Sequence, residues 1–272
     1  PPSITLIVYA GLTEASVQKL FLATLTPAIL CTVAFLAYTL WYGKKKNLPK
    51  QPKKTAKEAG KIMLDAIWAL LLPVIVLGLI FSGATTVTEA AAVSCLYSAV
   101  VSLFIYKTIT FKDLLKILGD SAVSIAAIMI LVGMSKATAY VVISSQMPQL
   151  FMDFITSITD SRFVVLLIIN VIFLILGCLM EGNCIIVMMV PLLLTLVKSF
   201  GIDLLQFGVM SAINIYIGCI TPPVGVSLLL GCKLGKTSVG GTFKAILPFF
   251  AISMVILILV TYWPSFTLWL IH

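Results

Sequence analysis

The stretch that decides the fold is residues 218–225, which read GCITPPVG inside an apolar run from 206 to 235. Two prolines between two glycines cannot continue a helix, because proline has no amide hydrogen and its ring clashes with the preceding turn. In lipid, the main-chain groups that such a break releases must be satisfied by protein, water or ions. The stretch therefore predicts a broken helix in an apolar environment.

The chain is too apolar for a water-soluble fold. Of its 272 residues, 61% are hydrophobic and 10% are charged, whereas roughly a quarter of the residues are charged in soluble domains. We predict an all-α integral membrane protein whose solvent is the lipid bilayer. The net charge is +8, but the lysines cluster between apolar runs, above all at 44–61, as in cytoplasmic loops. We therefore expect no nucleic-acid partner.

Chemistry based on histidine or on a cysteine framework is not expected. The sole histidine is His272, and the six cysteines lie in or beside apolar segments without a CxxC spacing. Such thiols behave as small buried hydrophobes. The sequence contains no HExxH motif, no paired aspartates, no Ser/His set and no ATP-binding phosphate loop. We expect neither an enzyme nor an ATPase.

Apolar runs and breaks divide the chain into segments. Thr88 is expected to cap the helix after a break at 82–88, with Glu89 in its first turn. Lys136 falls inside an apolar helix, so either it faces a wet cavity or the helix boundaries are shifted. The segments are 1–18, the end of a first broken helix; 19–61, a long helix and a lysine-rich loop; 62–118, two helices; 119–162, a helix and an external segment; 163–198, a hairpin; 206–235, the second broken helix; and 246–270, the last crossing.

The hairpin is predicted from an interrupted apolar run. Residues 163–198 are apolar except for Met180-Glu181-Gly182-Asn183. Each half has about 16 residues, and a full crossing needs about 20. Two short helices that meet at a polar tip describe a re-entrant hairpin, and two separate short crossings are the alternative.

A repeat offset by 221 residues relates the two broken helices. Pro1-Pro2 matches Pro222-Pro223, and Pro27 matches Pro248 at the same spacing. The lysine clusters give the two copies opposite directions, which predicts an inverted repeat; chance matching of the proline dipeptides is the alternative. The first copy has no hairpin before its break, so we expect that the chain is a fragment and that the missing hairpin lies upstream of Pro1.

Broken helices in inverted repeats form binding sites near the bilayer midplane. Carbonyl oxygens at helix C-termini suit Na⁺, and N–H groups at helix N-termini suit a carboxylate. The tip from Gly177 to Asn183 and the break from Gly218 to Gly225 are expected to face each other. Besides carbonyls they offer the Thr221 hydroxyl, and Asn214 adds an amide. Ser3, beside the first break, is a candidate contact for an anionic solute.

Each polar candidate also has a structural interpretation. Glu181 is either a sodium ligand or a hydrogen-bonded residue of the tip. Asn214 either contributes to the site or makes a hydrogen bond between helices. Ser3 either contacts the solute or caps the following helix, and Glu89 is interpreted as a structural first-turn charge.

Four stretches together resemble the large membrane subunit of TRAP (tripartite ATP-independent periplasmic) transporters. In order, they are Pro1-Pro2-Ser3-Ile4 with Tyr9; Leu71 through Pro73 to Thr88-Glu89-Ala90-Ala91; the hairpin from Gly177 to Pro191; and Phe207-Gly208 through Asn214 to Gly225. They span nearly the whole chain. The tip residue Glu181 departs from the family, which often has Asp there, and Thr85-Thr86-Val87 replaces a Pro-containing stretch.

The resemblance implies an elevator mechanism, in which a transport domain (1–18, 163–198 and 206–235) slides against a scaffold (19–61 and 62–118). It implies Na⁺ coupling, a small membrane subunit (Q) as scaffold partner and a periplasmic substrate-binding protein (P). It also implies a C4-dicarboxylate, keto acid or sialic acid as substrate, and a multi-pass location in the bacterial inner membrane. With the residues above, the sodium candidates are Gly177, Met180, Glu181, Asn183, Asn214, Gly218, Thr221, Pro222, Gly225 and Pro1, and the substrate candidates are Ser3, Pro2 and Thr221.

Three other functions compete with this interpretation. A related sodium-coupled carboxylate symporter would work without a binding protein. A membrane-embedded enzyme lacks support from any catalytic motif, and an occluding hairpin argues against a passive channel.

Overall fold

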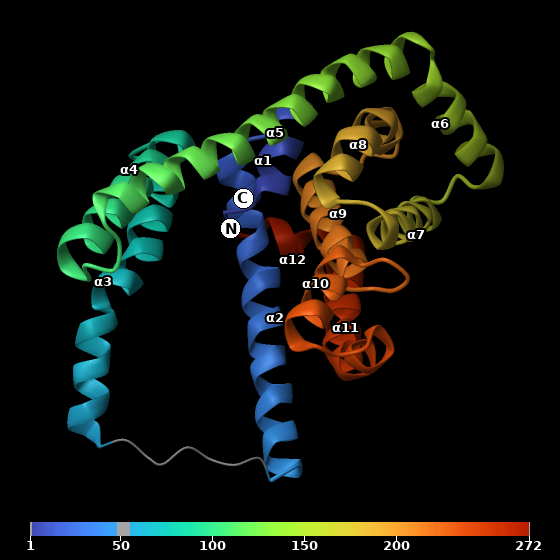
Figure 1. The fold of residues 1–272 in the computed structure, drawn as a ribbon. Helices are drawn as coiled ribbons and strands as arrows, with labels where there is room; N and C mark the ends of the chain where they lie inside the picture. Colours follow the sequence, from blue (N-terminus) through green and yellow to red (C-terminus); the bar gives the residue numbers. More distant parts are fainter. Residues whose placement is uncertain (1, 48–54, 272) are drawn as a thin grey trace. The chain divides into compact units, whose positions relative to one another are not determined.

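The computed structural model describes residues 2–47 and 55–271, and all regular structure in these ranges is helical (Figure 1). Seven of the described helices are long and apolar enough to cross a membrane. The chain forms two compact units, Pro1–Tyr42 with Ile130–His272, and Gly43–Met129. The candidate residues for binding all belong to the first, larger unit.

The larger unit is built around one buried helix. Most residues of α9 are buried, including Phe207, Met210 and Ile215, and six other described helices, α1, α7, α8, α10, α11 and α12, pack directly against it. In chain order, the helices of this unit are α1 (Ile4–Thr13), α2 (Val17–Lys45), the end of α5 (Phe111–Ser144), α6 (Met147–Ile158), α7 (Arg162–Leu179), α8 (Gly182–Ser199), α9 (Leu204–Cys219), α10 (Val226–Gly235), α11 (Val239–Tyr262) and α12 (Pro264–Leu268).

Helix α7 runs parallel to α9. The Arg162 guanidinium lies 3.5 Å from the Gln206 side-chain oxygen at one end, and Asn170 bonds to Asn214 farther along. Helix α8 runs the other way, because it starts beside Ile215 and only a short loop joins its end to α9. Helices α7 and α8 therefore form a hairpin whose tip lies at the C-terminal end of α9. Re-entry of this hairpin within a membrane stays a prediction.

Helix α2 and the C-terminal part of the chain run in opposite directions. The Trp269 indole donates a hydrogen bond of 2.7 Å to the Thr26 hydroxyl, and the rings of Phe35 and Phe249 lie 5.1 Å apart. Residue numbers thus rise along one segment as they fall along the other. An inverted repeat requires this antiparallel arrangement of α2 and α11.

The broken helix is confirmed, with its parts α9 and α10 separated by residues 220–225. Several predicted boundaries are wrong by six to eight residues, because the helices extend beyond their apolar runs into segments that contain charged residues. Helix α3 (Ala56–Phe81) starts at 56 rather than 62, α5 at 111 rather than 119, and α11 at 239 rather than 246. Helix α11 also ends at Tyr262 rather than 270, since Pro264 starts the separate α12.

Two further corrections concern capping and the stretch that follows α5. The predicted external segment before the hairpin contains a helix, α6, with an αL residue, Gln146, at its N-terminus.

In the smaller unit, Thr86 rather than Thr88 caps α4 (Val87–Val100), which continues into a π-helical turn, η1 (Val101–Ile105). Glu89 lies three residues after Thr86 and accepts its amide hydrogen at 2.7 Å, the reciprocal pairing of a capping box. The side chain of Lys136, within α5, lies outside the described residues.

Tyr9 joins α1 to the start of α9. The Tyr9 side chain is fully buried, and its hydroxyl donates a hydrogen bond of 2.6 Å to the Leu204 carbonyl. Its ring fills the space over Gly208, where an added Cβ would lie 2.6 Å from a ring carbon. This contact fixes the short helix α1 against the core.

The Tyr9→Phe substitution is expected to destabilise the protein by about 1 kcal/mol, because a buried hydrogen bond is lost while the ring remains. Tyr140→Phe, at an exposed position of α5, is the matched control and should change nothing. Thermal denaturation of the purified protein in detergent measures both. An unchanged Tm for Tyr9→Phe would show that the hydroxyl contributes no stability.

Candidate functional site

The hairpin tip and the helix break meet at two glycines. A Cβ added to Gly218 would lie 2.5 Å from the Gly177 Cα, and a Cβ added to Gly177 would lie 2.9 Å from the Gly218 Cα. These neighbours are main-chain atoms, which no rotamer change can move aside. Glycine at both positions therefore lets the C-terminal ends of α7 and α9 cross backbone to backbone, as small residues do in membrane helices.

A second main-chain contact links the tip to the start of α10. The Gly225 amide donates a hydrogen bond of 3.0 Å to the Cys178 carbonyl. Gly225 has a φ of +41°, in the left-handed region, and a Cβ there would lie 2.6 Å from the Thr221 carbonyl oxygen and 3.1 Å from that of Cys219. Two carbonyl oxygens thus converge on the space that a side chain would fill.

The break leaves carbonyl groups without helical donors. Pro222 and Pro223 have no amide hydrogen, so the carbonyls of Gly218 and Cys219 cannot receive the usual bond from four residues ahead. Gly218 accepts instead from the Thr221 amide at 2.9 Å. The Thr221 hydroxyl donates to the Ile217 carbonyl at 2.7 Å. The arrangement offers neutral oxygen ligands of the kind that a hard monovalent cation needs.

Glu181 is the N-cap of α8. One of its carboxylate oxygens accepts the Asn183 amide at 3.0 Å and the Cys184 amide at 3.2 Å. The other accepts the Asn183 side-chain amide at 2.9 Å. The structure therefore shows the hydrogen-bonded tip residue that the sequence allowed, with the carboxylate charge held at the positive end of α8.

Asn214 lies one turn before the break, and its amide joins α9 to α7. It donates to the Asn170 main-chain and side-chain oxygens at 2.8 and 2.7 Å. Asn170 in turn donates to the Thr261 hydroxyl of α11 at 3.1 Å. The helix-to-helix hydrogen bond expected as the alternative is therefore present. The Asn214 side-chain oxygen is buried without a partner among the described residues.

A cavity of about 390 Å³ lies beside the tip, and it is called the polar cavity here because hydroxyl, amide and carboxylate groups line part of it. Its walls are the first turns of α1, α8 and α10 and one face of α9. The Tyr216 hydroxyl lies 3.3 Å from both the Ser3 and Thr5 hydroxyls, and Thr5 donates to the Asn183 side-chain oxygen at 3.3 Å. The lining residues are Pro2, Ser3, Ile4, Thr5, Glu181, Gly182, Asn183, Ile215, Tyr216, Cys219, Val226 and Ser227.

Three helix N-termini point into this polar cavity, and they differ in how they are capped. Ser3 caps α1 through a long contact of 3.5 Å to the Leu6 amide, and Glu181 caps α8. Gly225, before α10, offers no side-chain cap. The first-turn amides of α10 therefore remain the best placed to bind an anion, since unpaired N–H groups and the helix dipole both favour negative charge.

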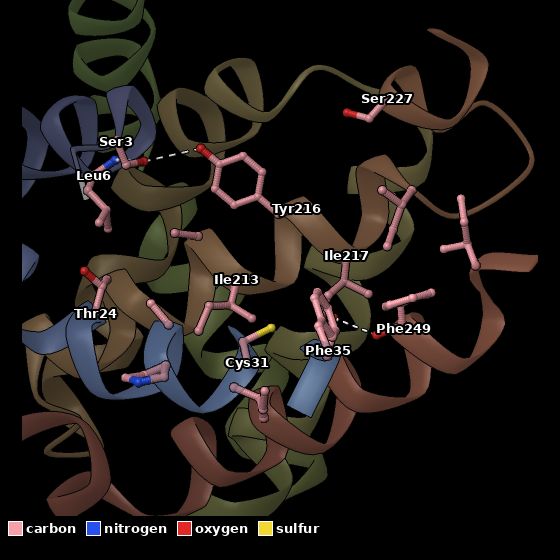
Figure 2. Close-up of a pocket in the computed structure, with 17 residues that line it drawn as sticks. Ser3, Leu6, Thr24, Cys31, Phe35, Ile213, Tyr216, Ile217, Ser227 and Phe249 are labelled. Atoms are coloured by element: carbon pink, nitrogen blue, oxygen red, sulfur yellow. Dashed lines mark hydrogen bonds between the residues drawn. The ribbon is translucent and has the colours of Figure 1, made fainter. Parts of the chain in front are cut away.

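A larger apolar cavity, of about 570 Å³, lies between α1, α2, α9 and α11 (Figure 2). Ser3, Tyr216 and Ser227 lie along its upper edge in the figure, and these residues also line the polar cavity. The remaining lining residues are Leu6, Thr24, Pro27, Ala28, Cys31, Phe35, Ala212, Ile213, Ile217, Ile220, Ile246, Phe249, Ser253 and Ile256.

Most predicted site residues come together at the tip, the break and the polar cavity. Gly177, Met180, Glu181 and Asn183 lie at the tip, and the break supplies the candidates from 218 to 225, Pro222 included. Pro2 and Ser3 line the polar cavity, whereas Asn214 is set back in the helix packing. Pro1 lies outside the described residues. Whether any of these residues binds sodium or substrate stays a prediction.

Sequence reasoning missed Thr5, Asn170 and Tyr216. Asn170 is a polar residue in a run treated as apolar up to the tip, and its isolation there was a usable signal. Tyr216 lies two residues after Asn214 in α9. Its contact with Ser3 joins positions more than 200 residues apart, which the repeat did not indicate.

Comparison with known proteins gives the family. Residues 1–266 match the family described as "Tripartite ATP-independent periplasmic transporter, DctM component". The chain is 37% identical over 98% of its length to the C4-dicarboxylate TRAP transporter large permease protein DctM of Pseudomonas aeruginosa. It is 34% identical, again over 98%, to the sialic acid TRAP transporter large permease protein SiaM of Vibrio cholerae.

The chain spans 63% of the length of each of these two relatives. It covers 43% of a longer relative, the sialic acid TRAP transporter permease protein SiaT of Haemophilus influenzae, at 32% identity. All three are permease components rather than enzymes. The family match over nearly the whole chain and the seven apolar helices lead to one conclusion: this chain belongs to the DctM family of tripartite ATP-independent periplasmic transporters and is a multi-pass membrane protein.

Proposed function

We propose that the protein is the large membrane subunit of a sodium-coupled transporter that imports a small organic acid across the bacterial inner membrane. A periplasmic binding protein delivers the acid, and a small membrane subunit forms part of the scaffold. The family description supports a system of three components that does not use ATP. The names of the relatives support an acid such as a C4-dicarboxylate or sialic acid as the class of substrate.

The main-chain contact between tip and break is the observation that supports sodium coupling. At this contact, carbonyl oxygens of Cys219 and Thr221 converge beside Gly225. Oxygen ligands without formal charge suit Na⁺ in a membrane protein, because a buried carboxylate would be costly to keep ionised. These ligands come from the end of α9 and from the break itself, and they lie beside Gly225, which precedes α10 and bonds to the hairpin tip. An ion bound there would therefore hold α9, α10 and the tip together.

Substrate binding is proposed in the neighbouring polar cavity. The free amides at the start of α10 would bind a carboxylate, and the Ser3, Thr5 and Tyr216 hydroxyls would add hydrogen bonds. Residues 220–225 separate the carbonyl end of α9 from the amide end of α10, so one break offers a cation site and an anion site in succession. Filling both neutralises the charge that must move through the bilayer.

Coupling to sodium supplies enough free energy for accumulation. One sodium ion that moves down a tenfold gradient and a potential of 100 mV releases about 3.7 kcal/mol. In the proposed elevator mechanism, the body that contains the hairpin and the broken helix would move as a unit. The hydrogen bonds of Asn170 and Gln206, which join α7, α9 and α11, would keep that body rigid.

Uptake by the full-length protein, reconstituted in proteoliposomes with its membrane partner, tests the proposal. Accumulation of labelled organic acid is expected to require both an inward sodium gradient and the binding protein. Uptake that is driven by sodium but unaffected by the binding protein would favour the related symporter instead. Uptake that is independent of sodium would refute the coupling.

The Gly218→Ala substitution tests the contact itself. The added methyl group would push the tip away from the break, so the sodium concentration for half-maximal uptake should rise at least about tenfold, the equivalent of about 1.4 kcal/mol. Gly231→Ala in α10 is the matched control, because a Cβ there meets nothing within 4 Å. Equal sodium dependence in the two variants would remove the contact from the sodium site.

A further inference from the structure

The polar and apolar cavities share Ser3, Tyr216 and Ser227. Tyr216 lines both spaces at this shared edge, and in Figure 2 its hydroxyl points toward Ser3. About half of the Tyr216 side chain is exposed, so the ring is not fixed by packing on all sides. A molecule bound in the polar cavity can therefore extend past the ring into the apolar one.

The interior of the apolar cavity offers few free hydrogen-bonding groups. The Thr24 hydroxyl donates to the Phe21 carbonyl at 2.8 Å, and the Ser253 hydroxyl donates to the Phe249 carbonyl at 2.9 Å. Both hydroxyls are thus occupied within their own helices. The rest of the wall away from the shared edge is aliphatic or aromatic, apart from Cys31, and favours a hydrocarbon group over a hydroxyl or a second carboxylate.

The polar cavity is suited to one carboxylate rather than two. Its described lining residues include no lysine or arginine, and its single charged side chain is Glu181. The one N-terminus without a side-chain cap is that of α10. A second carboxylate on the same molecule would meet either the negative charge of Glu181 or the apolar wall.

We propose that the transported acid is a monocarboxylate with an apolar body, bound with its carboxylate at the start of α10 and its body beyond Tyr216 in the apolar cavity. This inference rests on the proposed function and narrows its substrate class. The shared edge favours a substrate over a lipid chain as the occupant. The hydroxyls of Ser3, Tyr216 and Ser227 line both cavities, so the polar groups of the apolar cavity are concentrated where the polar cavity begins.

Calorimetric titration of the purified full-length permease with its membrane partner, without the binding protein, tests the inference. Straight-chain monocarboxylates from butyrate to octanoate are compared at saturating sodium. Affinity should rise about fourfold per added methylene until the cavity is filled, because each buried methylene contributes a constant increment. Succinate should bind more weakly than butyrate, and octanol more weakly than octanoate.

Two variants locate the apolar body. Ala28→Phe places a ring in the apolar cavity, so it should abolish the rise in affinity from butyrate to octanoate. Ala37→Phe, on the same helix but outside both cavities, is the matched control and should keep the gain. If Ala28→Phe does not fold, the smaller change Ala28→Leu should still reduce the increase in affinity per added methylene.

The outcomes separate this inference from the proposed function. Sodium-dependent binding of all acids with equal affinity would overturn the inference and leave the function intact. If octanol binds as well as octanoate, the apolar cavity is a lipid site. If Ala28→Phe leaves the rise in affinity with acid length unchanged, the hydrocarbon chain of the acid binds elsewhere. Either result overturns the inference. Failure of every acid in this series to bind would overturn the inference alone, because the proposed function also admits acids outside the series and is tested separately by sodium-driven uptake.

Discussion

The close crossing of α7 and α9 at Gly177 and Gly218 is the contact on which the candidate site depends. Because neither residue has a side chain, the two helix ends approach to main-chain distance. Gly225 can then donate its amide to the Cys178 carbonyl, which fixes the start of α10 beside the hairpin tip. The carbonyl end of one helix and the amide ends of two others consequently lie around one small volume.

Buried side-chain hydrogen bonds hold this arrangement together along its length. Gln206 donates to the Val260 and Thr261 carbonyls at 3.0 and 2.8 Å, and Asn170 connects Asn214 to the Thr261 hydroxyl. These bonds join α7, α9 and α11 where lipid-like surroundings make an unsatisfied polar group costly. The same helices also pack through large apolar side chains such as Phe173. Both kinds of contact resist separation of the tip from the break.

The site relies on main-chain dipoles where a soluble protein would often use charged side chains. Glu181 is the only charged residue that lines the polar cavity among the described residues, and its charge is engaged by the N-terminus of α8. Helix ends supply partial charges of both signs without the cost of bringing a full charge into lipid. An apolar cavity can adjoin such a site, because helix ends, unlike fully charged side chains, do not need a large hydration shell between the site and the cavity.

The sequence by itself determined the membrane class, the interruptions at 180–183 and 218–225, and the family, because apolar length, proline and glycine act locally. It left the helix ends uncertain by several residues, since capping by Thr86 or a polar first turn depends on side-chain geometry that apolar periodicity does not report. Only the tertiary structure decided that Asn214 faces Asn170, that Glu181 caps its own helix and that Tyr216 meets Ser3. The pairings of Asn214 and Tyr216 join distant parts of the chain, and they follow from how closely helices pack rather than from any local preference. The Glu181 cap is local, but the sequence left it open because a tip carboxylate can equally bind an ion.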